Sequence, residues 1–206
     1  MTLIRKIILV GSSALILAGV GFFIGNYLKQ ESVLNSISVG KTEIGVSQKE
    51  GCAIKMEERI VRGNSLSPLI ENGDTVKVLF GYYDCNDIKR NDIVLYSYAG
   101  NEDPLIKIVK GIPGDKFALQ KTQVGCWNIL INDKILENSQ NSPYCISEQG
   151  YKMLSLYEKD YQGVIPEDAY LIMGNLISGA TDSTRYGLVH KNDILGKAIT
   201  IEAEPQ

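Results

Sequence analysis

Hydrophobic and polar positions follow two different patterns along this chain. Residues 7–24 contain no charged side chain, and residues 25–28 extend the apolar run. Because a helix rises about 1.5 Å per residue, roughly 20 apolar residues can cross the hydrocarbon core of a bilayer. The first pattern therefore predicts one transmembrane helix at residues 7–28.

The predicted span could be a cleaved signal peptide or an uncleaved signal anchor. The bulky sequence at its end, Gly-Phe-Phe-Ile at 21–24, offers no small-x-small cleavage site and favours an anchor. Arg5 and Lys6 precede the span, so the positive-inside bias places residues 1–6 in the cytoplasm. We expect residues 29–50 to form a polar linker and the remaining residues to lie on the outer face of the membrane.

Short β-type segments separated by turn residues make up the second pattern. The sequence contains 20 glycines and 11 tyrosines, a composition that favours strands and turns. We predict a mainly β domain over residues 51–206 whose strands cover 53–61, 75–80, 93–98, 105–109, 169–173, 187–189 and 194–201, with a hairpin at 127–136. Residues 137–163 are polar, and we predict an irregular insertion or long loop there rather than core.

Composition excludes several kinds of chemistry. A net charge of -3 argues against a nucleic-acid-binding protein, which would need a basic face. The single histidine, His190, lies beside a polar turn, and we expect it at the surface. The four cysteines show no CxxC spacing, so we expect no metal site. They could form two disulfides, with three possible connectivities, or remain free buried thiols.

A segment rich in turn residues at 62–70, called the serine loop below, and a lysine on a predicted strand together suggest a Ser–Lys hydrolase. A serine hydroxyl needs a base to become a nucleophile, and a lysine can accept its proton only when burial keeps the amine neutral. Lys107 lies within the predicted strand at 105–109, although an exposed strand lysine is an alternative interpretation. Ser65 follows Gly63 and Asn64, which tolerate unusual backbone angles and could support an oxyanion hole. Ser67 is a competing nucleophile, and local sequence does not choose between the two serines.

At these residues the chain resembles the type I signal peptidases, a family of membrane-anchored Ser–Lys proteases. The family's serine box, Ser-Gly-Ser-Met-x-Pro-Thr, is matched by residues 63–69 with the nucleophile at Ser65. Its lysine box, Lys-Arg-x-x-Gly-x-Pro-Gly-Asp, is matched by residues 107–115 and assigns the general base to Lys107 rather than Lys110. Residues 89–94 and 131–136 are similar to two further family segments.

The last family box, Gly-Asp-Asn-x-x-x-Ser-x-Asp-Ser-Arg-x-x-Gly, is matched in part by residues 174–187. The resemblance gives supporting roles to Asp182 and Ser183. Ala180 replaces a serine that often hydrogen-bonds the lysine, a loss for which Ser178 or Thr181 could compensate. Gly63 replaces another supporting serine. Such departures are similar to those of conjugative-transfer (TraF-type) members, which mature specialised substrates such as pilin.

The resemblance implies an antiparallel β catalytic domain that needs no cofactor. Secreted or pilin-like precursors would bind as extended strands, with Leu66, Pro68 and Ile106 near the pockets that select small residues. Membrane lipid would contact residues 7–28, and no nucleic acid is expected as a partner. An alternative function is an inactive scaffold or binding subunit of a secretion or conjugation apparatus. Self-cleaving SOS-response repressors share the chemistry but carry a DNA-binding domain where this chain has an apolar span.

Overall fold

The computed structural model describes residues 52–98, 103–177 and 179–201. The chain divides into two compact units, Met1–Ser47 and Gln48–Gln206, and every described residue belongs to the second. The predicted cytoplasmic segment, transmembrane helix and linker at residues 1–50 lie outside the described residues. Within the described ranges, no helix is long and apolar enough to cross a membrane.

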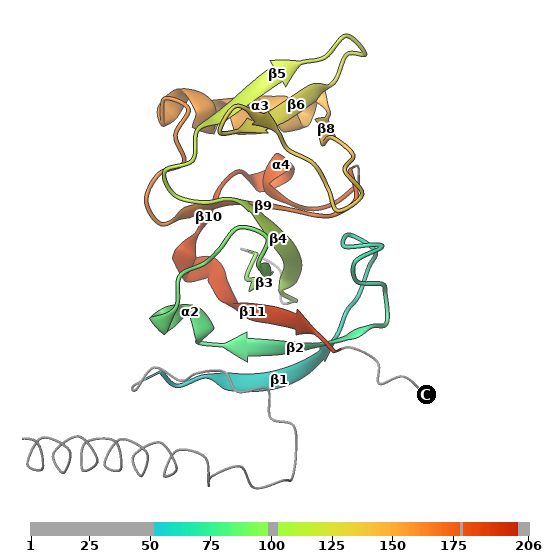
Figure 1. Cartoon of the computed structure of the whole chain (residues 1–206), viewed down its shortest axis with the longest axis vertical. Helices are drawn as coiled ribbons and strands as arrows, with labels where there is room; N and C mark the ends of the chain where they lie inside the picture. The colour runs from blue at the N-terminus through green and yellow to red at the C-terminus, as the bar shows by residue number, and fades with distance from the viewer. Residues whose placement is uncertain (1–51, 99–102, 178, 202–206) are drawn as a thin grey trace, which may run out of the picture. The chain divides into compact units, whose positions relative to one another are not determined.

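A seven-stranded sheet forms the larger part of the described domain (Figure 1). Its strand order is β1-β2-β11-β3-β4-β9-β10, and each neighbouring pair is antiparallel. The strands are β1 (Lys55–Ile60), β2 (Thr75–Phe80), β3 (Ile93–Tyr96), β4 (Leu105–Gly111), β9 (Ala169–Met173), β10 (Val189–His190) and β11 (Ile194–Thr200). The prediction of a mainly β domain is therefore confirmed.

A smaller antiparallel sheet contains β5 (Phe117–Lys121), β6 (Trp127–Ile131), β7 (Lys134–Ile135) and β8 (Cys145–Ile146). The predicted hairpin at 127–136 is present as β6 and β7. Asn132 and Asp133 turn the chain between them with φ of 51° and 65°, values that these two residue types tolerate better than most. Strand β5 was not predicted, because its sequence lacks a run of β-branched residues.

The expectation of irregular structure at 137–163 was wrong. Helix α3 (Glu148–Asp160) occupies half of that segment and lies beside β5 and β6 (Figure 1). Ser147 caps it, since its Oγ accepts a hydrogen bond from the N–H of Gly150 at 3.3 Å. Leu154 is fully buried on its inner face, whereas the exposed residues are mostly polar, with Leu156 as an apolar exception. Whether the segment is an insertion remains a prediction.

Three short helical turns complete the described elements: α2 (Tyr82–Cys85), α4 (Ser183–Tyr186) and the 3-10 turn η1 (Lys191–Asp193). Buried apolar side chains gather in three clusters, and each fully buried aliphatic side chain stabilises the fold by about 1.5–3 kcal/mol. The first cluster bears on function because it contains two residues of the serine loop, Leu66 and Ile70, each 1% exposed. Their burial anchors the loop to the larger sheet.

All four cysteines are paired, as Cys52–Cys85 and Cys126–Cys145. The sequence left both the oxidation state and the connectivity open, and the structure selects this one of the three pairings. His190 is exposed, as expected, and its Nδ1 accepts a hydrogen bond from the N–H of Asn192 at 3.2 Å.

Candidate active site

Ser65 and Lys107 meet in the folded domain. Lys107 comes from the middle of β4, where it pairs with Val94 of β3. Its Nζ lies 2.9 Å from Ser65 Oγ and donates a 2.7 Å hydrogen bond to the carbonyl oxygen of Ile106. The lysine side chain is 3% exposed, so the contact lies in a largely dry environment. A serine and an amine at this separation can exchange a proton directly.

Burial changes the acidity of the lysine. Loss of hydration lowers the pKa of Lys107 to about 8, while the nearby Asp182 carboxylate opposes this by stabilising the ammonium. An ordinary lysine has a pKa near 10.4, so only a few tenths of a per cent of it is neutral at pH 8. At a pKa of about 8, roughly half of Lys107 is neutral at that pH. The amine can therefore act as a base under mildly alkaline conditions.

The pH dependence of turnover should follow from this pKa. We expect kcat/KM for peptide cleavage to rise through a midpoint near pH 8 and then level off, because only the neutral amine accepts the serine proton. Stopped assays from pH 6 to 10 at constant ionic strength measure the profile. In an Asp182→Asn variant the midpoint should move to lower pH, since the charge that favours the ammonium is gone. A wild-type profile that is flat from pH 7 to 10 would contradict the assignment.

The serine loop is held at its base and on its inner side. The N–H of Val61 donates to the carbonyl oxygen of Asp74 at 2.8 Å. The N–H of Gly73 donates in turn to the carbonyl oxygen of Val61 at 2.9 Å. Gly63 has a φ of 85°, which favours glycine, and its N–H donates to Asn72 Oδ1 at 2.9 Å. The predicted support residue Gly63 thus shapes the entry to the loop.

The two serines of the loop have different partners. Ser67 Oγ donates to a carboxylate oxygen of Glu71, within the loop itself. Ser65 Oγ faces Lys107 instead. The N–H of Ser65 has no hydrogen-bond partner among the described residues, and Asn64 uses its carbonyl oxygen to accept from the N–H of Ser67 at 3.0 Å. The Ser65 N–H therefore remains available to an incoming oxygen atom.

The chain after β9 passes very close to the serine loop. The N–H groups of Asn175 and Leu176 donate to the carbonyl oxygen of Ser65 at 2.6 and 3.2 Å. An ideal Cβ on Gly174 would lie 2.9 Å from that same oxygen and 2.7 Å from Ala180 Cβ. Glycine is therefore required at position 174 by this close approach.

Substitution of Gly174 should test that packing. We expect Gly174→Ala to destabilise the domain by about 1–3 kcal/mol through overpacking, and to lower activity by displacing the Ser65 carbonyl. Chemical denaturation and peptide-cleavage assays measure the two effects. Adding Ala180→Gly removes one of the two close contacts and should recover part of the stability. Unchanged stability in Gly174→Ala would show that the approach is looser than described.

Asp182 and Ser183 support the backbone around the dyad. Asp182 Oδ2 accepts from the N–H of Gly174 at 3.0 Å, and its Oδ1 accepts from the N–H and hydroxyl of Thr184 at 3.0 and 2.7 Å. Ser183 Oγ accepts from the N–H of Ile172 at 3.0 Å. Both residues are buried and hold the segment that follows β9. Of the two, only Asp182 acts on Lys107, through the electrostatic effect of its charge.

The missing hydroxyl at Ala180 is not replaced by Thr181, because within the described ranges Lys107 Nζ bonds only Ser65 Oγ and the Ile106 carbonyl. Ser178 lies outside the described residues. The Ile106 carbonyl therefore orients the amine from within the lysine's own strand.

The three predicted substrate-contact residues have different environments. Leu66 and Ile106 are 1% and 9% exposed and lie in the first core cluster, where they offer little free surface to a substrate. Pro68 is exposed. Their contacts with a substrate remain predictions. The sequence interpretation also gave no role to Asn175, which is completely buried against the serine loop.

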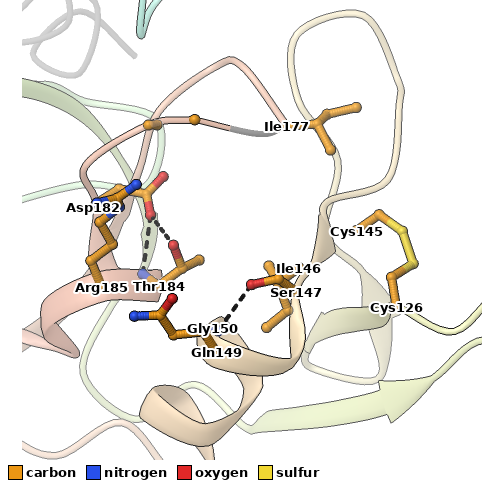
Figure 2. A pocket seen from close by; sticks show the side chains of 12 residues that line it. Cys126, Cys145, Ile146, Ser147, Gln149, Gly150, Ile177, Asp182, Thr184 and Arg185 are labelled. Atoms are coloured by element: carbon orange, nitrogen blue, oxygen red, sulfur yellow. Dashed lines mark hydrogen bonds between the residues drawn. A yellow bond between two sulfur atoms is a disulfide. The ribbon is translucent and has the colours of Figure 1, made fainter.

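A pocket of about 250 Å³ opens between the N-terminus of α3 and a second wall formed by Ile177 and by residues between 179 and 185 (Figure 2). Asp182 and Ala180 contribute to its wall, and the Cys126–Cys145 disulfide borders the opposite side. Neither Ser65 nor Lys107 lines it, so this pocket is not the place where they react. No group of three or more His, Cys, Asp or Glu side chains that could hold a metal occurs among residues 52–98, 103–177 and 179–201.

Comparison with known proteins places the chain in a family. The family model described as signal peptidase, peptidase S26, matches residues 51–202. Signal peptidase IB of Staphylococcus aureus (strain COL) is 25% identical over 148 residues, covering 66% of this chain and 72% of that protein. Signal peptidase I of Bacillus caldolyticus is 27% identical over 141 residues, covering 67% and 74%.

A crystal structure of a signal peptidase I from Enterococcus faecalis V583 is also similar to part of the chain. It has a TM-score of 0.39 and 20% sequence identity, and the match covers 54% of this chain and 97% of that one. The match of the family model to most of the chain carries the assignment. The chain belongs to the S26 signal peptidase family of serine proteases.

Proposed function

We propose that this protein is a membrane-anchored endopeptidase that removes signal peptides from secreted or pilin-like precursors, with Ser65 as nucleophile and Lys107 as general base. The observation that carries the proposal is the 2.9 Å separation of Ser65 Oγ and Lys107 Nζ around a lysine that is 3% exposed. An exposed lysine would keep its proton at neutral pH and could not serve as a base.

The reaction proceeds through an acyl-enzyme. Ser65 Oγ attacks the scissile carbonyl carbon while the neutral amine of Lys107 takes the hydroxyl proton. The tetrahedral oxyanion is stabilised by the N–H of Ser65, which has no other partner among the described residues. The Lys107 ammonium then protonates the departing amine as the peptide bond breaks. In the second half, Lys107 deprotonates a water molecule that hydrolyses the ester and regenerates Ser65.

The substrate binds as an extended strand, with small residues before the scissile bond. Family membership supports a signal-peptide substrate, and an anchor at residues 7–28 would hold the domain near precursors as they leave the membrane. Two disulfides support a catalytic domain on the outer face of the cytoplasmic membrane, because such bonds persist in oxidising compartments.

A second candidate function is an inactive scaffold or binding subunit. Ala180 favours it, because the lysine lacks the hydroxyl partner that many relatives use. An inactive relative would bind precursors without cleaving them or forming a covalent bond to Ser65.

The two functions are separated by incubating the full chain in detergent with a precursor that has alanine one and three residues before its processing site. We expect cleavage after the nearer alanine, identified by the masses of both products. A matched precursor with tryptophan at that position should remain intact. A serine-acylating inhibitor should label the peptide that contains Ser65. Intact alanine precursor together with unlabelled Ser65 would overturn the endopeptidase proposal in favour of the scaffold.

A further inference from the structure

Asn175 is a buried residue at the centre of a hydrogen-bond network beside Ser65. Its side chain has no exposed surface. Its Nδ2 donates to the carbonyl oxygen of Ser67 at 2.8 Å and to Ser139 Oγ at 2.9 Å, while its Oδ1 accepts from the N–H of Ser139 at 3.0 Å. Its backbone N–H donates to the Ser65 carbonyl at 2.6 Å, and its carbonyl accepts from Asn138 Nδ2 at 3.1 Å.

The partners fix which way the carboxamide points. The carbonyl of Ser67 can only accept, and the N–H of Ser139 can only donate. Exchanging the amide oxygen and nitrogen of Asn175 would therefore break both contacts. The site needs one donor group and one acceptor group in the same planar side chain, which asparagine supplies and aspartate does not.

The network joins the serine loop to the connection between β7 and β8. Asn175 fixes the loop at two carbonyls, one on the nucleophile and one two residues later. On the other side, Ser139 belongs to a segment whose ends are themselves held. Lys110 Nζ donates to the carbonyl of Glu137 at 3.1 Å, and Tyr144 OH donates to the carbonyl of Gly174 at 2.6 Å. The loop is thus braced against a fixed part of the domain.

We propose that Asn175 is a positioning residue for the nucleophile, whose carboxamide locks the serine loop against Ser139 and so keeps Ser65 Oγ beside Lys107. This inference rests on the proposed function, because it takes Ser65 as the nucleophile. Aspartate occupies this place in the family's box, where Asn175 stands here. In this chain an aspartate could not donate to the Ser67 carbonyl and would turn a lone pair towards it at a fully buried position.

Asn175→Asp tests the proposal with almost no change in shape. In the full chain in detergent we expect kcat for the alanine precursor to fall about 10- to 100-fold while KM changes less than about threefold, because the loop is displaced but the substrate surface is retained. Acylation of Ser65 by the inhibitor should slow in parallel. Hydrogen exchange at the loop amides of Ser67, Leu69 and Ile70 should become faster, while exchange in β6 should not change.

Two further variants control for stability. Asn132→Ala removes an asparagine in the turn between β6 and β7 that bonds Lys116 and Asp115, away from the serine loop, and it should destabilise the domain without lowering kcat. Ser139→Ala removes one partner of Asn175 and keeps the N–H contact, so kcat should fall about two- to fivefold. This milder variant decides the matter if Asn175→Asp does not fold.

The outcomes separate this inference from the proposed function. Unchanged kcat in both Asn175→Asp and Ser139→Ala, or unchanged exchange in the loop, would overturn the positioning role. A loss of kcat in Asn132→Ala equal to that in Asn175→Asp would also overturn it, because general destabilisation would then explain both. A wild-type chain that cleaves no precursor would refute the proposed function, and faster loop exchange in Asn175→Asp would then show only that Asn175 locks the serine loop in place.

Discussion

Replacing Ser65 with alanine is expected to lower kcat/KM for precursor cleavage by at least about 10³-fold, because among the described residues Ser65 Oγ is the hydroxyl that contacts Lys107 Nζ. The matched control is Ser67→Ala, two positions along the same loop. Its hydroxyl bonds Glu71 rather than the lysine, so the change should cost less than about tenfold. Initial rates with the same precursor measure both variants.

The comparison of the two serines is sharper than either substitution alone. Both variants alter the same loop, so a general loosening would lower both activities together. If Ser65→Ala cleaves the precursor at the wild-type rate, Ser65 is not the nucleophile. Loss of inhibitor labelling in Ser65→Ala, with labelling retained in Ser67→Ala, gives a second reading that does not depend on the precursor chosen.

Replacing Lys107 with methionine is expected to abolish measurable cleavage, a loss of at least about 10³-fold, and at the same time to stabilise the folded domain at neutral pH. The first effect follows from removal of the base. The second follows from burial, which lowers the pKa of Lys107 to about 8 in the folded state, below its value in the unfolded chain. Below pH 8 the folded domain must hold a buried ammonium, and methionine does not carry that cost.

The sign of the stability effect can be checked against pH. Between the folded pKa of about 8 and the unfolded value near 10.4, the unfolded chain binds more protons, so wild-type stability rises with pH. Lys107→Met should therefore be more stable than wild type by about 1–3 kcal/mol at pH 7, and the difference should shrink towards pH 10. Denaturant unfolding at pH 7, 8.5 and 10 measures it. A destabilised variant at pH 7 would contradict a costly buried lysine.

Lys110→Met is the matched control for the kinetic effect. Lys110 lies on the same strand and is also buried, which lowers its pKa, but its amine contacts the carbonyl of Glu137 instead of a serine. We expect this variant to keep cleavage within about tenfold of wild type. Equal losses in the two lysine variants would mean that the strand, rather than the Lys107 amine, had been disturbed.

The strands of the larger sheet were predictable because each is a short β-branched or aromatic run bounded by glycine, proline or polar turns. Helix α3 was not, because few of its residues are apolar and only one face of a surface helix needs to be. Its N-terminal cap at Ser147 was visible in the sequence and is the signal that could have located it. Strand β5 has a burial pattern with few inward residues, which weakens the alternation that identifies a strand.

The site was predictable only through motifs that link distant segments. Local physics left Ser65 and Ser67 equal, since their difference lies in which way each hydroxyl points after the loop closes. Burial of Lys107 depends on packing across β4, which residue spacing does not reveal. Leu66, next to Ser65, is 1% exposed and packs in the core, a burial that the motif alone did not indicate. Asn175 was passed over because its partners are up to 108 positions away in sequence.

The Cys52–Cys85 bond closes a covalent ring that contains β1, the whole serine loop and β2. β1 is an edge strand and would be the first to peel away if the chain were pulled from its N-terminal side. The disulfide passes such tension from Cys52 directly to the segment after β2, a strand paired on both sides within the sheet. If the proposed anchor at residues 7–28 holds the domain, a pulling force on the N-terminal side would therefore pass through the disulfide and bypass the loop that carries Ser65.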